Sequence, residues 1–217
     1  MRMIGLTQRL FPDLHRRLRG GDANGPAVPV PRIETSRLQL RPFTPADLPA
    51  LEALYVDPET TRYLQNGPYR PARARRVARR ALESAIEELA VFGYGSLALV
   101  EREGDGRMIG CCGVSALPIP GPERIELSYL LARDRRGRGL MAEAAEAVVA
   151  DAFDRLGFTQ LIAVSHPENT ASLRLLERLG FRPAGALHCY GRTLPFYALD
   201  RRDAQCASPV PPTTAIE

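Results

Sequence analysis

The chain has 217 residues, of which 45% are hydrophobic and 25% are charged. This balance is typical of a folded globular protein of one domain, and it excludes a chain that is disordered throughout. No apolar run approaches the roughly 18 residues needed to cross a bilayer, and the first residues lack the apolar segment and cleavage site of a secretory signal. We therefore expect a soluble cytoplasmic protein with no membrane partner. The formal charge is +4, and all 29 basic residues are arginine.

Two segments have compositions that favour neither a helix nor a central strand. Residues 20–31, GGDANGPAVPVP, join glycines to alternating prolines, and residues 207–217 read ASPVPPTTAIE. We expect an N-terminal extension and linker over 1–31, one folded domain over 32–202, and a flexible tail over 203–217.

The expected domain falls into two blocks with different element orders. The first block begins with a strand and two helices and continues with three apolar strands separated by turn sequences, which predicts an antiparallel meander. The second block alternates helix, strand and helix before a last pair of strands. We therefore predict an α/β fold with a mixed, mostly antiparallel sheet flanked by about four helices. The predicted strands are 37–41, 95–101, 108–117, 123–132, 160–165, 182–192 and 196–200, and the predicted helices are 45–55, 71–90, 140–156 and 170–179.

A glycine-rich turn joins the last strand of the meander to the next helix. Residues 135–140 read RRGRGL, so glycines that allow close backbone approach lie directly before the unpaired N–H groups and positive dipole of a helix N-terminus. This arrangement is suited to binding phosphate, and the arginines add positive charge. The spacing fits neither the dinucleotide fingerprint nor the P-loop, and an ordinary glycine turn is the alternative.

Three segments carry a resemblance to a known family. Residues 136–144, RGRGLMAEA, resemble the acyl-CoA pyrophosphate loop of the GCN5-related N-acetyltransferase (GNAT) superfamily, and 169–181, NTASLRLLERLGF, resemble its next helix. Residues 35–43, TSRLQLRPF, followed by Asp47, are similar to the start of the ribosomal-protein N-terminal acetyltransferase branch, RimJ/RimL-like. The resemblance covers roughly 32–200 and implies the GNAT fold with acetyl-CoA as cosubstrate.

The resemblance implies a cofactor site whose parts follow one another along the chain. Backbone groups of the strand end would bind the pantetheine, the loop amides would hold the pyrophosphate, and the next helix start would lie near the thioester. Met141 stands where the superfamily usually has Gly or Ala, although this branch often has Met there. Leu176 replaces the tyrosine that protonates the departing thiolate in many members, so that role is vacant or reassigned. The implied cofactor-binding residues are Leu130, Leu131, Arg136, Gly137, Arg138, Gly139, Leu140, Met141, Asn169 and Ser172.

Two residues are candidates for the chemistry itself. Glu126 matches the acidic residue that this branch often places beside the acceptor amine, where a carboxylate could take the amine proton through one water. The alternative is a strand carboxylate paired with an arginine, and Glu123 is the weaker candidate. Ser172 could donate a hydrogen bond to the thiolate. An N-cap at Asn169 followed by a helix would explain Asn169 and Ser172 equally well in structural terms.

The implied function is an N-acetyltransferase in which a primary amine, expected to be a peptide or protein N-terminal amine, attacks the thioester directly in a ternary complex. A small-molecule amine acetyltransferase of aminoglycoside type and a noncatalytic acyl-CoA-binding module, suggested by Leu176, stay open. So does RNA or ribosome association through the arginines of residues 70–80. Histidine and cysteine spacings predict no metal site and free thiols, with Cys111 and Cys112 on opposite strand faces. The oligomeric state is not indicated.

Overall fold

The computed structural model describes residues 31–65 and 67–206, and it shows an α/β fold built on one eight-stranded sheet. The strand order is β1-β2-β3-β4-β5-β6-β8-β7, and every neighbouring pair is antiparallel except β5 and β6. The strands are β1 (Ile33–Glu34), β2 (Leu38–Arg41), β3 (Ser96–Glu101), β4 (Met108–Ala116), β5 (Ile125–Leu131), β6 (Gln160–Val164), β7 (Arg182–Cys189) and β8 (Arg192–Asp200).

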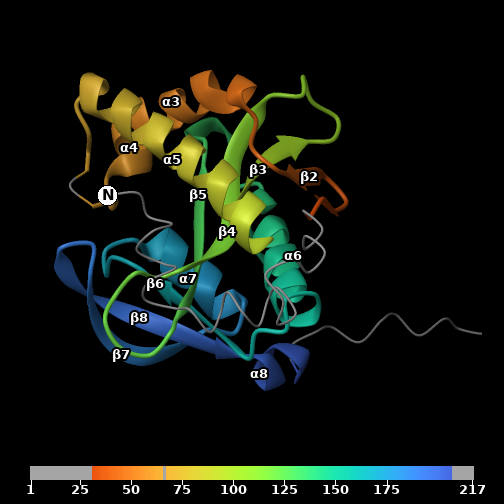
Figure 1. The fold of residues 1–217 in the computed structure, drawn as a ribbon, viewed down its shortest axis with the longest axis vertical. Coiled ribbons are helices and arrows are strands. Elements are labelled where there is room, and N and C mark those ends of the chain that lie inside the picture. Colours follow the sequence, from red (N-terminus) through yellow and green to blue (C-terminus); the bar gives the residue numbers. More distant parts are fainter. Residues whose placement is uncertain (1–30, 66, 207–217) are drawn as a thin grey trace, which may run out of the picture.

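Helices cover both faces of the sheet (Figure 1). On one face, α3 (Leu48–Val56) and α5 (Pro71–Phe92) pack together over β3 and β4, where Ala98 and Met108 belong to their core cluster. On the other face, α6 (Leu140–Asp154) and α7 (Thr170–Arg178) bury their apolar sides in the larger cluster. Cys112 belongs to this larger cluster, whereas Cys111 packs against the α3 and α5 cluster.

The predicted fold class is confirmed, and the element order agrees closely with the sequence. The antiparallel meander of β3, β4 and β5 and the four longer helices are present at nearly the predicted bounds. The first predicted helix begins with a short 3₁₀ turn, Pro45–Asp47, before α3. The sequence reading missed two short helices, α4 (Pro58–Thr61) and α8 (Arg201–Cys206), because four to six residues carry too little periodicity to detect.

Some expectations concern segments outside this description. Residues 1–30 and 207–217 lie outside the described residues, and α8 extends over the first part of the expected C-terminal tail. The cysteines at 111, 112 and 189 are free thiols, as predicted for them. In residues 31–65 and 67–206, no helix combines the length and apolar character needed to span a bilayer.

Candidate active site

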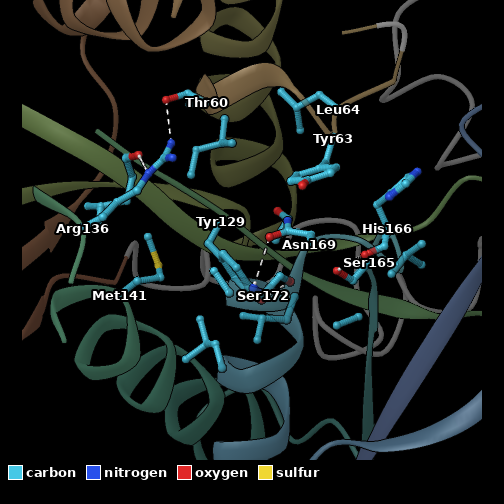
Figure 2. Close-up of a pocket in the computed structure, with 18 of the residues that line it drawn as sticks. Thr60, Tyr63, Leu64, Tyr129, Arg136, Met141, Ser165, His166, Asn169 and Ser172 are labelled. Carbon is cyan, nitrogen blue, oxygen red and sulfur yellow. Dashed lines mark hydrogen bonds between the residues drawn. The ribbon is translucent and has the colours of Figure 1, made fainter. Parts of the chain in front are cut away.

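The only parallel strand pair of the described sheet opens into a cleft. β5 and β6 pair at Glu126 and Ile162, and beyond this point the strands separate. The resulting cleft has a volume of about 690 Å³ and is lined by both strands, the glycine turn, the start of α6, the α7 N-terminus and the turn between β7 and β8 (Figure 2). It brings together residues from almost the whole length of the domain.

The glycine turn lies at one end of this cleft. Gly137 and Gly139 have φ angles of 76° and 73°, a left-handed conformation that residues with a Cβ rarely adopt. Gly139 is also the N-cap of α6, so the first N–H groups of the helix have no intrahelical acceptor. Nine of the ten implied cofactor-binding residues line the cleft, as does Glu126, and the exception is Arg138, whose guanidinium pairs with Glu101 at 2.9 Å.

The side chain of Arg136 connects the turn to two other elements. Its Nη2 donates to the Thr60 hydroxyl of α4 at 2.7 Å, and its Nε donates to the Leu131 carbonyl at 3.2 Å. Figure 2 shows Arg136 reaching across the cleft wall towards Thr60. The guanidinium therefore contributes positive charge near the helix N-terminus and fixes the turn against α4. Thr60 gave no signal in the sequence, since its partner lies 76 residues away.

A carboxylate of α6 holds the outer side of the same turn. Glu143 accepts hydrogen bonds from the Thr35 hydroxyl at 2.6 Å, the Ser36 hydroxyl at 3.0 Å, and the Arg37 backbone N–H and Nε at 2.8 and 2.6 Å. Arg37 also donates through Nη1 to the Arg138 carbonyl at 2.8 Å. Burial raises the pKa of Glu143, but these bonds outweigh it and hold the pKa at about 2. Through Glu143, residues 35–37 therefore hold the outer side of the glycine turn in place, and we call this arrangement the clamp.

Glu126 lies where β5 and β6 begin to separate, and it is only 5% exposed. The Tyr190 hydroxyl donates to its carboxylate from the turn between β7 and β8, and the Val164 N–H is also hydrogen-bonded to it. Burial raises the pKa of Glu126 to about 7, although both hydrogen bonds favour the charged form. The alternative of an arginine ion pair does not describe this carboxylate, whose partners are a tyrosine hydroxyl and a backbone amide.

A hydroxyl pair occupies the middle of the cleft. The hydroxyls of Tyr129 on β5 and Ser172 on α7 lie 2.8 Å apart, and Figure 2 shows both side chains directed towards each other. Asn169 is the α7 N-cap and accepts from the Ser172 N–H at 3.2 Å, so its capping role is confirmed. Leu176 is 1% exposed and belongs to the main core. Its side chain does not line the cleft.

Aromatic residues and one arginine form the wall opposite the glycine turn. The ring of Tyr63 stacks on His166 with centroids 5.2 Å apart, and the Tyr63 carbonyl accepts from Arg192 Nη2 at 2.7 Å. His166, to which the sequence reading assigned no role, lines the cleft, and its Nδ1 accepts from the Glu168 N–H at 3.2 Å. Tyr63, Tyr190 and Arg192 carried no local pattern that could have predicted this position.

Comparison with known proteins places these features in a family. Residues 37–182 match the acetyltransferase (GNAT) domain family. The N-acetyltransferase p20 of Bacillus licheniformis is 30% identical over 170 residues, which are 76% of this chain and 92% of p20. The N-acetyltransferase YoaA of Bacillus subtilis is 31% identical over 168 residues, which are 74% and 88% of the two chains.

Solved structures agree with this assignment. An acetyltransferase from Agrobacterium tumefaciens is 28% identical with a TM-score of 0.65, over 83% of this chain and all of that one. RimL, a ribosomal L7/L12 α-N-protein acetyltransferase solved with coenzyme A, has a TM-score of 0.62 over 82% of this chain and 99% of its own, but at 20% identity it shares only the fold. The class is therefore that of acyl-CoA-dependent N-acetyltransferases. More specifically, the chain belongs to the acetyltransferase (GNAT) domain family.

The clamp at Glu143 predicts a pH-dependent contribution to stability. A carboxyl whose pKa falls from 4.5 to about 2 on folding stabilises the protein above pH 4.5 and loses this effect as the pH falls towards 2. Glu143→Gln should therefore lower the free energy of unfolding by roughly 2 kcal/mol at pH 7, since the full shift corresponds to about 3 kcal/mol and glutamine keeps some of the hydrogen bonds. Urea unfolding at pH 7 and pH 3.5 measures the difference, which should shrink at the lower pH.

A matched control for this variant is Glu146→Gln on the same helix. Glu146 is half-exposed and pairs only with Arg178 at 3.2 Å among the ion pairs of the described residues, so its removal should change stability little at either pH. A Glu143→Gln variant as stable as the wild type at pH 7 would contradict the clamp.

Proposed function

We propose that this enzyme transfers the acetyl group of acetyl-CoA to the α-amine of a peptide or protein N-terminus, by direct attack of the amine in a ternary complex. The observation that carries the proposal is one continuous cleft with a helix N-terminus suited to anions at one end and the buried carboxylate of Glu126 at the other. The thioester supplies an activated acyl group with a good leaving group. The protein then has to position the amine, remove its proton and stabilise the negative charge that develops on the thioester oxygen and sulfur.

The pyrophosphate would bind at the glycine turn. Residues 136–141 present backbone N–H groups next to the positive end of α6, and the Arg136 guanidinium adds a charge-assisted donor. The pantetheine would extend between β5 and β6, where the separated strands leave backbone groups of Leu131 without a partner strand on the cleft side. The register of β4 with β5 directs the backbone groups of Leu130 to β4, and the Leu131 carbonyl accepts from Arg136, so the Leu131 N–H is the stronger backbone partner.

Glu126 would act as the general base, directly or through one water. Its pKa of about 7 means that a large fraction is ionised at neutral pH while the group is still basic enough to accept a proton. A peptide α-ammonium has a pKa of ~7.8 and a lysine side chain ~10.4, so proton transfer to Glu126 is unfavourable by about 0.8 or about 3.4 units respectively. This difference supports an α-amine as the acceptor. The Tyr190 hydroxyl would orient the carboxylate.

The Tyr129 and Ser172 hydroxyls would stabilise the departing thiolate. They form a hydrogen-bonded pair in the middle of the cleft, between the glycine turn and Glu126. A hydroxyl that already holds a partner can donate its own hydrogen to the sulfur, and the second hydroxyl polarises it. This pair would take the role that a tyrosine at the position of Leu176 has in many family members.

The cofactor assignment predicts that Gly139→Val abolishes acetyl-CoA binding. A valine at φ 73° is strained, although its Cβ would make only an ordinary contact at 3.6 Å with the Arg37 guanidinium, so the backbone of the turn would move. Isothermal titration calorimetry should show at least a tenfold loss of affinity. The matched control is Gly157→Val, which has φ 69° and open space around its Cβ position outside the cleft. Unchanged affinity in Gly139→Val would contradict this assignment.

The base assignment predicts a pH-dependent defect in Glu126→Gln. Wild-type kcat/KM should rise with an apparent pKa near 7, whereas the variant should lose on the order of 100-fold at pH 8 and less at pH 6, where Glu126 is already largely protonated. The melting temperature should not fall, because the raised pKa shows that the ionised carboxylate is unfavourable in its buried site. Glu123→Gln, an exposed change three residues away, should behave as the wild type. Equal losses at pH 6 and pH 8 would exclude Glu126 as the base.

The experiment that tests the acceptor is a comparison of amines by mass spectrometry. Short peptides with a free N-terminus should be acetylated with a higher kcat/KM than the same peptides blocked at the N-terminus and carrying one lysine, and higher than a panel of aminoglycosides. If only the small amines react, the enzyme is a small-molecule acetyltransferase and the peptide proposal is wrong. If acetyl-CoA binds but no amine is modified, the noncatalytic reading is correct.

A further inference from the structure

The first half of α5 carries an unusual concentration of positive charge. The chain has no acidic residue between positions 70 and 82, and within the part of the chain that the structure describes, none of the arginines in this segment forms an ion pair. We call these exposed residues the arginine face: Arg70, Arg73, Arg75, Arg76, Arg79 and Arg80.

The arginine face is electrostatically unfavourable for the helix that carries it. The N-terminus of a helix is its positive end, and the first turn of α5 contains no acidic residue to compensate. Arg75 and Arg79, and likewise Arg76 and Arg80, are like-charged neighbours one turn apart, which also disfavours the helix. A local arrangement that lowers stability is expected where a surface serves binding, and an anionic partner would relieve the repulsion.

One side of the arginine face adjoins the cleft. Val77 lines the cleft, and Arg73 and Arg80 lie four residues before and three residues after it, on the same stripe of the helix. The Arg73 guanidinium lies 5.4 Å from the ring centroid of Tyr69, which is another lining residue. Arg75 and Arg79 are two residues from Val77 and therefore point to the other side of α5.

Arg192 continues this positive charge into the cleft. It lines the cleft wall opposite the glycine turn, where its Nη2 donates to the Tyr63 carbonyl, while its buried Nε has no hydrogen-bond partner. The other arginines that line the cleft belong to different elements. Arg136 lies at the glycine turn, and Arg174 and Arg178 belong to α7.

We propose that Arg73, Arg80 and Arg192 bind acidic side chains of the acceptor, so that the preferred substrate is a peptide whose N-terminal amine is followed by aspartate or glutamate. This inference rests on the proposed function. The arginine face adjoins the cleft that contains Glu126, so a substrate bound to this face must place a primary amine near Glu126. An acidic peptide provides both a nucleophilic amine and the negative charge, whereas the amino groups of RNA bases are weak nucleophiles because their lone pairs are delocalised into the rings. The two oxygens of a carboxylate also match the bidentate geometry of an arginine guanidinium.

The test compares peptides of equal length that differ only in charge. A peptide with glutamates at positions two to four and its glutamine counterpart are acetylated at low salt and at 0.5 M salt, a concentration chosen so that screening acts within ~4 Å. We expect kcat/KM to favour the acidic peptide by about tenfold or more at low salt and by much less at high salt. The double variant Arg73→Gln/Arg80→Gln should lose most of this preference but still acetylate the neutral peptide at the wild-type rate.

The control is Arg75→Gln/Arg79→Gln, which removes the same charge from the other side of the helix. It should keep the preference for the acidic peptide. Both double variants should melt at or above the wild-type temperature, because each removes charge repulsion, so a lost preference cannot be explained by unfolding.

Three outcomes would overturn the inference. If both peptides are acetylated equally well, the surface does not select acidic acceptors, although the proposed function survives. If peptide preference is absent and a single-stranded RNA binds in a salt-dependent manner that both double variants weaken, the arginine face binds nucleic acid. If no peptide is acetylated, the inference and the proposed function both fail.

Discussion

The separation of β5 from β6 is the constraint on which the site depends. The two strands are the only parallel neighbours among the described strands, and they pair at a single position, Glu126 with Ile162. Beyond that pair, backbone groups that would satisfy a sheet face an open cleft, which an extended ligand can enter as a further strand would. The end of β5, the glycine turn and the α6 N-terminus all line this cleft. Cofactor binding and chemistry can therefore share one cleft.

Two carboxylates of this domain show how environment assigns different roles to the same chemical group. Glu126 is buried with two donors, and its pKa rises to about 7, so it can exchange protons near neutral pH. Glu143 has four donors, one of which is the Arg37 guanidinium, and its pKa of about 2 keeps it ionised. An always-charged carboxylate is suited to holding the turn through Arg37, while a titrating one is suited to catalysis.

The local parts of the site could be predicted from the sequence, and the long-range contacts could not. Glycines in a turn before a helix and an Asn N-cap are features of a few consecutive residues, so their roles in the backbone could be inferred directly. The donor to Glu126 lies 64 residues away, the partner of Ser172 lies 43 away, and Thr35 meets Glu143 across 108 residues. Such pairs depend on how the strands are ordered in the sheet, which periodicity does not reveal.

Leu176 raises the question of how the thiolate can depart without the expected acid. Burial raises the pKa of Tyr129 to about 12, and that of a thiol such as coenzyme A is ~8.5, so proton transfer from tyrosine to thiolate is unfavourable by about 3.5 units. In the proposed mechanism the Tyr129 and Ser172 pair therefore stabilises the thiolate by donating a hydrogen bond and keeps its protons. A thiolate with this pKa is already an acceptable leaving group near neutral pH, and solvent can protonate it after departure. The core position of Leu176 is thus compatible with catalysis, because the reaction needs a donor at the sulfur rather than an acid.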